Sequence, residues 1–244
     1  MPAPIATFDA ARAARYDHDI PLAMPGYGVL HALTATLCAG LLARRGPDAP
    51  PARVLLAGAG TGAELAALAS AGAAWRFVAA DPSADMLAHL RTRAASLGVS
   101  DRVAVHDGVV AALPAEAAFD AATLLLVLHF VPDDGAKLAL LRDVAARLRP
   151  GAPLFVADMH GEPGTAAFAL LLGAWETHLH VTAGAPADQA RAAAAAVRTQ
   201  LHVVSEAQLA ALLGEAGFEA PVRYWQGLLA GAWVARRWLI PMSQ

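Results

Sequence analysis

Short, continuously apolar runs alternate with segments of helical periodicity along most of this 244-residue chain. The apolar runs are predicted to hold buried strands, at 53–62, where the run ends in glycines and turns sharply, and at 75–80, 102–106, 119–131 and 154–158. The segments between them are predicted to be helices, at 63–72, 83–97 and 135–148. Strands that alternate with helices form a parallel sheet covered on both faces. The pattern therefore predicts a doubly wound α/β fold.

The two ends of the chain depart from this alternation. Residues 1–45 are predicted to form a helical arm or lid, with an amphipathic helix at 27–45. Residues 160–204 are a predicted helical insert that covers the substrate, and a further helix follows at 205–218. Two last apolar runs, 221–229 and 231–239, are close enough to pair as a hairpin. We find no repeat or linker, so residues 1–244 are predicted to form one domain.

Composition narrows the range of partners. The single cysteine, Cys38, forms no disulfide within the chain, which favours a cytoplasmic location. The net charge is −3, whereas a nucleic-acid binder usually has a basic face, so nucleic acid is not an expected partner. No uninterrupted apolar run reaches the roughly 20 residues that span a bilayer, and the N-terminus has no signal-peptide pattern. The expected partner is a small molecule. The apolar lid leaves open a homodimer surface as well as a substrate cover.

The first strand ends in the sequence G-A-G-T-G, from Gly58 to Gly62. Glycines at this point let the backbone approach a ligand and turn at once into a helix, whose N-terminal amides are unpaired. A dinucleotide fingerprint needs G-x-G-x-x-G, and here the third glycine comes one residue early. A nicotinamide dehydrogenase is therefore disfavoured.

Acidic residues follow the next two strands. Asp81 ends the second strand, where a carboxylate accepts hydrogen bonds from a ribose diol. The alternative role for Asp81 is that of an acid at a helix N-terminus. Asp107 ends the third strand and is a candidate acceptor for an adenine amino group. Successive strand ends line one crevice in open α/β sheets, so these groups are predicted to meet one ligand.

The motifs VLLAGAGTG, ADPSADML, HDG, LLLVLHFV and LRPGAPLFVAD, in this order, resemble the class I S-adenosylmethionine-dependent methyltransferases. Residues 16–27 (YDHDIPLAMPGY) and 205–237 further resemble the family of the carboxy-S-adenosylmethionine synthase of tRNA wobble-uridine modification. The resemblance covers nearly the whole chain. It implies a Rossmann-like, mostly parallel seven-stranded sheet with an antiparallel C-terminal hairpin. It also implies methyl transfer from S-adenosyl-L-methionine, with S-adenosyl-L-homocysteine as the product.

The resemblance implies roles for individual residues. The glycine loop would wrap the methionine part and the ribose, Asp81 would hold the ribose, and Asp107 would meet the adenine. The main chain near Leu125 would face the amino group of the cofactor. The full set of implied cofactor residues is Tyr27, Gly58, Ala59, Gly60, Thr61, Gly62, Asp81, Pro82, Met86, Asp107, Gly108 and Leu125.

Two departures from the family patterns matter. Methyltransferases usually carry an acid in the first strand, as in V-L-D-L-G, and this chain has Leu56 there. The synthase holds the extra carboxylate of its cofactor with an arginine, and the aligned position is Ala194, with Arg191 and Arg198 nearby. We therefore favour plain methyl transfer to a nitrogen, oxygen, sulfur or carbon atom of a small molecule. The synthase chemistry and an inactive cofactor-binding module are the alternatives.

Three side chains are candidates for the chemical step. His129 ends the fourth strand and His160 follows the fifth, and histidine titrates near neutral pH. Each is a candidate base or orienting group, and the alternative for each is a hydrogen-bonded histidine at the rim. Tyr16 resembles an arm tyrosine that sits over the reacting methyl group, and it also suits an aromatic anchor for the arm.

The insert carries an H-x-H pair, His178 and His180. Residues two apart point away from each other on a helix, and this segment is predicted to be helical. We therefore predict that the pair lines a pocket and that the chain has no metal site.

Overall fold

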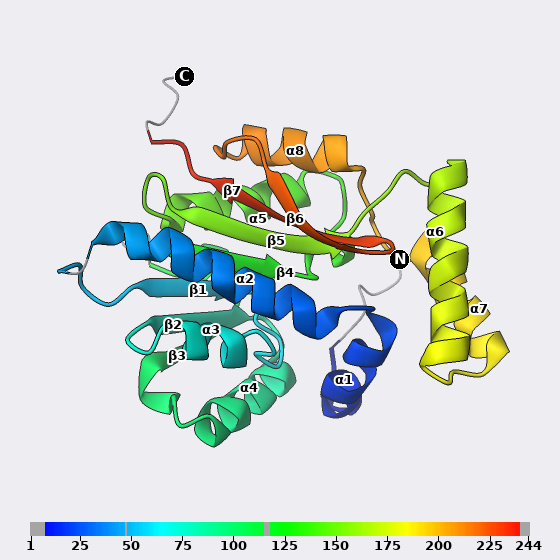
Figure 1. The fold of residues 1–244 in the computed structure, drawn as a ribbon, viewed down its shortest axis with the longest axis horizontal. Coiled ribbons are helices and arrows are strands. Elements are labelled where there is room, and N and C mark those ends of the chain that lie inside the picture. The colour runs from blue at the N-terminus through cyan, green and yellow to red at the C-terminus, as the bar shows by residue number, and fades with distance from the viewer. Residues whose placement is uncertain (1–7, 47, 115–117, 240–244) are drawn as a thin grey trace.

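The computed structural model describes residues 8–46, 48–114 and 118–239. It has a seven-stranded sheet of order β3-β2-β1-β4-β5-β7-β6 (Figure 1). The strands are β1 Arg53–Ala57, β2 Arg76–Asp81, β3 Val103–Asp107, β4 Ala121–Leu125, β5 Pro153–Met159, β6 Val222–Gly227 and β7 Ala230–Arg236. The first five strands are parallel, and β7 runs antiparallel to both β5 and β6. The predicted fold class, including the final hairpin, is confirmed.

Eight α-helices accompany the sheet in the described residues. They are α1 Ala10–Ala23, α2 Tyr27–Leu42, α3 Leu65–Ala71, α4 Ala84–Ser96, α5 Ala136–Arg147, α6 Ala166–Thr177, α7 Ala187–Thr199 and α8 Glu206–Glu215. Ser83 and Ser205 cap α4 and α8, because each hydroxyl accepts from the amide three residues later.

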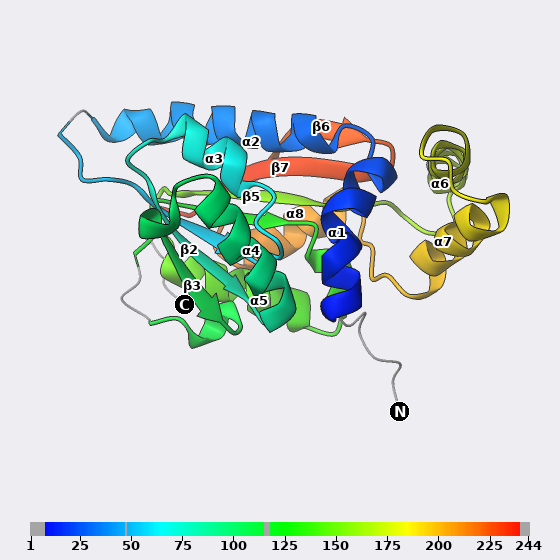
Figure 2. The same ribbon diagram turned by 90° about the horizontal axis from the view of Figure 1, so that it is seen from below.

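Helices cover both faces of the sheet, and each face has its own apolar core. On one face α2, α3 and α4 bury residues such as Cys38, Leu68 and Leu87 against β1 and β2. On the other face α5 and α8 bury Leu141 and Leu213 against β4 and β5. Figure 2 shows α2 and α3 on one side of the sheet and α5 and α8 on the other. This double cover explains why the strands read as continuous apolar runs.

The strand order reverses at β1, which lies between β2 and β4. In open α/β sheets, ligands bind beyond the carboxyl ends of the strands at such a switch point. Helix α1 lies at this end of the sheet, and α6 and α7 stand beyond it (Figures 1 and 2). The arm and the insert therefore both lie beside the crevice.

Strand β4 is shorter than predicted. The run 119–131 was expected to be one long strand, but β4 ends at Leu125 and a 3-10 turn, Leu128–Phe130, follows. Leu126 breaks the strand with a φ of 61°, and its amide donates to the carbonyl of Ala157 at 2.6 Å. A left-handed leucine costs roughly 1–2 kcal/mol. Such strain is common where a backbone must present functional groups.

The segment Tyr27–Arg45 is the one described helix long and apolar enough to cross a membrane, with a mean hydropathy of 1.2. Length and composition alone are weak evidence, because the core helix of a globular domain passes the same test. Leu30, Cys38 and Leu42 of this helix are buried within the protein.

Candidate active site

The glycine loop follows β1 at the switch point. Gly58, Gly60 and Gly62 have φ angles of 64°, 52° and 71°, a region that other residues rarely adopt. A Cβ on Gly58 would lie 2.5 Å from Val127, and one on Gly62 would lie 2.9 Å from Leu90. The loop therefore needs glycine for both conformation and space. The predicted loop residues between them, Ala59 and Thr61, are buried.

Asp81 is joined to the glycine loop. One carboxylate oxygen accepts from the amide of Gly60 at 2.9 Å, and the other accepts from the amide of Ser83 at 2.8 Å. Burial raises the pKa of Asp81, and the two amide donors oppose that rise. Each carboxylate oxygen can accept a further hydrogen bond. Asp81 therefore keeps acceptor capacity toward a ligand, and its role in holding the ribose stays a prediction.

The remaining predicted adenine-side residues lie close to Asp81. Asp107 is the register partner of Asp81 on β3 and is exposed. The amide of Gly108 donates to the carbonyl of Asp81 at 3.0 Å. Met86 is buried against the loop, because a Cβ on Gly60 would lie 3.3 Å from its Cε. Pro82 is exposed between Asp81 and Ser83.

An ionic cluster that the sequence did not reveal fastens α1 to the glycine loop. The hydroxyl of Thr61 donates to Asp17 at 2.6 Å, and the guanidinium of Arg93 donates to the other oxygen of Asp17 at 2.6 Å. Arg93 also donates to the carbonyl of Thr61 at 2.9 Å. Ser83 adds a bond to the carbonyl of Phe8 at 2.6 Å. The arm therefore covers the loop, as a lid should.

Replacing Asp17 with alanine is expected to loosen α1 without unfolding the domain. The loss of a hydroxyl bond and a partly exposed ion pair removes about 1–2 kcal/mol of local stability. Amide hydrogen exchange across residues 10–23 should then become about 5- to 30-fold faster. Asp19→Ala is the matched control, because its partner is the exposed His18 on the same helix. Equal exchange in both variants would contradict this role for Asp17.

Two tyrosines border the same region. Burial raises the pKa of Tyr16, on α1, to about 12, and burial also raises the pKa of Tyr27, at the start of α2. Both phenols are therefore neutral near pH 7. The ring of Tyr27 packs edge-on against His31, with centroids 4.5 Å apart. Tyr16 and Tyr27 thus contribute uncharged aromatic side chains to this region.

His129 forms a buried dyad with Asp158, a residue that the sequence reasoning missed. Nδ1 of His129 is hydrogen bonded to the carboxylate of Asp158, and the two residues are 5% and 2% exposed. His129 comes from the 3-10 turn after β4, and Asp158 comes from β5, the neighbouring strand. No described residue bonds Nε2 of His129. The dyad therefore leaves Nε2 of His129 available to accept a hydrogen bond or a proton from a ligand.

Lys137 of α5 holds the turn that carries His129. Its ammonium is buried and donates to the carbonyls of Leu128 and Val131, the latter at 2.8 Å. The carbonyl of His129 accepts from the amide of His202 at 2.8 Å. Leu125 and the strained Leu126 lead into this turn. The backbone near Leu125 is thus held at the end of β4, beside the glycine loop after β1.

His160 is not brought to the dyad. Its ring packs edge-on against Trp233, with centroids 4.9 Å apart, and its Nε2 has no partner. Burial lowers the pKa of His160, so the ring is neutral near pH 7. His160 follows the end of β5, two residues after Asp158, and Trp233 packs beside its ring. The geometry therefore favours His129 over His160 as the base.

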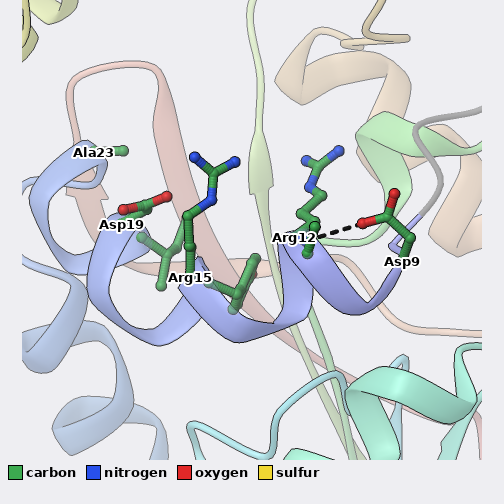
Figure 3. Close-up of a pocket in the computed structure, with 8 residues that line it drawn as sticks. Asp9, Arg12, Arg15, Asp19 and Ala23 are labelled. Atoms are coloured by element: carbon green, nitrogen blue, oxygen red, sulfur yellow. Dashed lines mark hydrogen bonds between the residues drawn. The ribbon is translucent and has the colours of Figure 1, made fainter.

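A cavity of about 510 Å³ lies along α1. Its lining includes Tyr16 and Ile20, and Figure 3 shows Arg12 and Arg15 extending from the helix on the same side. The Arg12 guanidinium lies 4.2 Å from the ring centre of Phe8 and 5.7 Å from that of Phe130. Because Phe130 follows His129, this cavity adjoins the turn that carries the dyad.

The insert histidines hold backbone rather than line this cavity. His178 donates from Nε2 to the carbonyl of Leu22 at 2.9 Å, and His180 donates from Nδ1 to that of Ala185 at 2.8 Å. Trp175 donates to the carbonyl of Ala23 at 2.7 Å. The insert is thereby tied to the end of α1. Within the described residues no three His, Cys, Asp or Glu side chains gather as a metal site.

Ala194, the position aligned with the synthase arginine, is buried between α6 and α7. It packs in an apolar cluster with Phe168, Leu172 and Val197. Arg191 and Arg198 are exposed on α7. This environment offers no partner for an extra carboxylate on the cofactor, which disfavours the synthase alternative.

Comparison with known proteins agrees with this geometry. Residues 54–151 match the family model described as the methyltransferase domain. Over 121 residues the chain is 36% identical to the ubiquinone biosynthesis O-methyltransferase of Xanthomonas campestris pv. campestris (strain B100). That alignment covers 50% of this chain and 48% of the relative. The chain thus spans about half the length of the curated relatives it matches.

Solved structures share the fold at low sequence identity. The CurJ carbon methyltransferase matches with a TM-score of 0.67 and 13% identity, over 94% of this chain and 61% of that one. An O-methyltransferase family protein from Burkholderia thailandensis matches with a TM-score of 0.59 and 17% identity, over 84% and 55% of the two chains. The match to the methyltransferase domain covers residues 54–151, which include the glycine loop, Asp81 and Asp107, and the sheet has the fold of the solved methyltransferases.

Proposed function

We propose that this protein transfers a methyl group from S-adenosylmethionine to a small molecule, and that the acceptor is a hydroxyl group. The buried His129–Asp158 dyad at the ends of β4 and β5 carries the second part of the proposal. Because an alcohol or phenol arrives protonated, its methylation benefits from a base, whereas a sulfide or a neutral amine needs none.

The residues at the switch point fit S-adenosylmethionine. The positive φ angles of its glycines let the loop pack tightly against Val127 and Leu90, and Gly58 and Gly60 remain partly exposed to a ligand. Asp81 has free acceptor capacity for the ribose, and Asp107 stands beside it for the adenine amino group. When bound, this cofactor supplies an activated methyl group. The role of the protein is then to align the nucleophile and to exclude water.

The dyad supplies the proton acceptor. In this proposal Asp158 holds the proton on Nδ1 of His129, which leaves the lone pair of Nε2 for the acceptor hydroxyl. The proton of the hydroxyl would move to Nε2 as the hydroxyl oxygen takes the methyl group, whose bond to the cofactor sulfur would break and leave S-adenosylhomocysteine. The nearby carboxylate stabilises the resulting imidazolium. Lys137 keeps the turn in place, and α1 closes the site.

The cavity along α1 is the proposed acceptor site. It adjoins Phe130, and its lining includes the guanidinium groups of Arg12 and Arg15, which make no ion pair with a described residue. The ubiquinone biosynthesis relative is named as an O-methyltransferase, which supports an oxygen acceptor. The solved carbon methyltransferase of similar fold shows that the fold alone does not choose the atom.

Calorimetric titration of the stripped protein with S-adenosylmethionine and then S-adenosylhomocysteine tests the first part. We expect micromolar binding of both, which corresponds to about 8 kcal/mol of binding free energy. A screen of phenols and catechols with a radiolabelled methyl donor tests the second part. Binding of neither compound would refute the proposal, and transfer only to amines or thiols would refute the hydroxyl acceptor.

A further inference from the structure

One buried carboxylate has no place in the site described so far. Glu64 directly precedes α3, two residues after the glycine loop, and is 6% exposed. Its Oε1 accepts from the hydroxyl of Thr123 at 3.4 Å. No described arginine, lysine or histidine lies within ion-pair distance of it. Burial of a carboxylate without a cation is costly, so a compensating ligand is expected.

Glu64 places a carboxylate close to the first-strand position that lacks the usual acid. Leu56 of β1 and Thr123 of β4 are register partners, so their side chains share a face of the sheet. The carboxylate of Glu64 is bonded to Thr123 and therefore stands next to the side chain of Leu56. Leu56 occupies the position where methyltransferases usually carry an acid. The start of α3 thus brings a carboxylate to the place that β1 leaves apolar.

We propose that Glu64 binds the ammonium group of the cofactor, in place of the missing first-strand acid. The inference rests on the proposed use of S-adenosylmethionine, and it assigns a ligand group to a residue outside the family motif. Glu64 lies at the same end of the sheet as the glycine loop, because it follows Gly62 by two residues and directly precedes α3.

The surroundings of Glu64 favour a cationic ligand. Burial raises its pKa to about 7, Arg93 lowers it and Asp81 raises it. Arg93 is already engaged by Asp17 and the carbonyl of Thr61, so it does not neutralise Glu64 directly. The neighbouring phenols of Tyr16 and Tyr27 are uncharged near pH 7, because burial raises the pKa of each. His31, which packs against Tyr27, is also neutral, because burial lowers its pKa to about 4.

These pKa shifts fix the sign of the pH dependence. An ammonium ligand binds the ionised form of Glu64. Below pH 7 Glu64 is mostly protonated, so binding of the ligand releases its proton. The affinity for S-adenosylhomocysteine should rise about 5- to 10-fold between pH 5.5 and 7.5 as Glu64 ionises. Without ligand the sign is opposite: the raised pKa means that Glu64 costs stability as pH rises from 4.5 to about 7.

Glu64→Gln tests the assignment with two ligands that differ in the amino-acid part. S-Adenosylhomocysteine carries the ammonium, and methylthioadenosine lacks the whole amino-acid end. We expect the variant to lose about 10- to 100-fold in affinity for S-adenosylhomocysteine at pH 7.5. Its affinity for methylthioadenosine should change less than about 3-fold, and the pH dependence of S-adenosylhomocysteine binding should flatten.

The controls separate this inference from the proposed function. Glu215→Gln removes an exposed carboxylate on α8 and should leave both affinities unchanged. An equal loss for both ligands would mean that Glu64 acts only through the fold, and no loss for either would also overturn the assignment. If the unmodified protein binds neither ligand, the proposed function itself fails. The ligand-free variant should melt at least as high as the unmodified protein at pH 8, which checks its folding.

Discussion

His129→Ala is expected to lower the rate of methyl transfer to a phenol by about 10²- to 10⁴-fold, the usual contribution of a positioned base. The substitution removes the nitrogen that takes the proton and leaves Asp158 buried without its partner. The affinity for S-adenosylhomocysteine should stay within a few-fold, because the glycine loop and Asp81 lie on other strands. The measurement is single-turnover transfer from a radiolabelled donor, together with calorimetry on the same preparation.

Two comparisons make the His129 result specific. His160→Ala should retain most activity, because its ring packs against Trp233 and not against the dyad. A phenol of lower pKa needs less help from a base, so the loss in His129→Ala should shrink as the acceptor becomes more acidic. A loss that does not vary with acceptor acidity, or a larger loss in His160→Ala, would refute His129 as the base.

Asp81→Ala should weaken the binding of S-adenosylhomocysteine by about 100-fold or more. Two hydrogen bonds from a ribose diol to a charged acceptor contribute about 1.5–3 kcal/mol each, and 1.4 kcal/mol is a factor of ten. The amides of Gly60 and Ser83 also lose their acceptor, so the loop itself is loosened. Calorimetric titration gives the affinity directly.

Asp107→Ala is the matched control for Asp81. It removes a carboxylate from the end of the adjacent strand, in register with Asp81, but one that is exposed. Asp107→Ala should lower the affinity for S-adenosylhomocysteine by no more than about 10-fold, as expected for the loss of a single partly solvated hydrogen bond. If Asp81→Ala bound the ligand normally, the ribose site would have to lie elsewhere.

The sequence was most informative where chemistry and periodicity coincide. The glycines after β1 and Asp81 after β2 are close in sequence to the strands that present them, so their meeting at one sheet edge could be predicted. The break in the strand at Leu126 could not be predicted, because a leucine with positive φ looks like any other leucine in an apolar run. The run around it therefore suggested a longer strand than β4.

The missed site residues share a different cause. Asp17 and Arg93 are 76 positions apart, and Asp158 meets His129 across 29 positions. Periodicity predicts which face a residue takes but not which distant side chain meets it. The sequence could not separate His129 from His160, because both follow strands and only Trp233 distinguishes their surroundings. Glu64, directly after the glycine loop, was visible in the sequence but carried no motif.

Helix α1 touches both halves of the proposed site. Asp17 bonds to Thr61 on the glycine loop, and five residues earlier Arg12 lies over Phe130 beside the dyad. A ligand that orders this helix from one side reduces the entropy that the second ligand must still overcome. Cofactor and acceptor are then thermodynamically coupled, and each strengthens the binding of the other by the same factor. The protein would thus favour the ternary complex over either binary one, with the ordering of α1 as the source of the coupling.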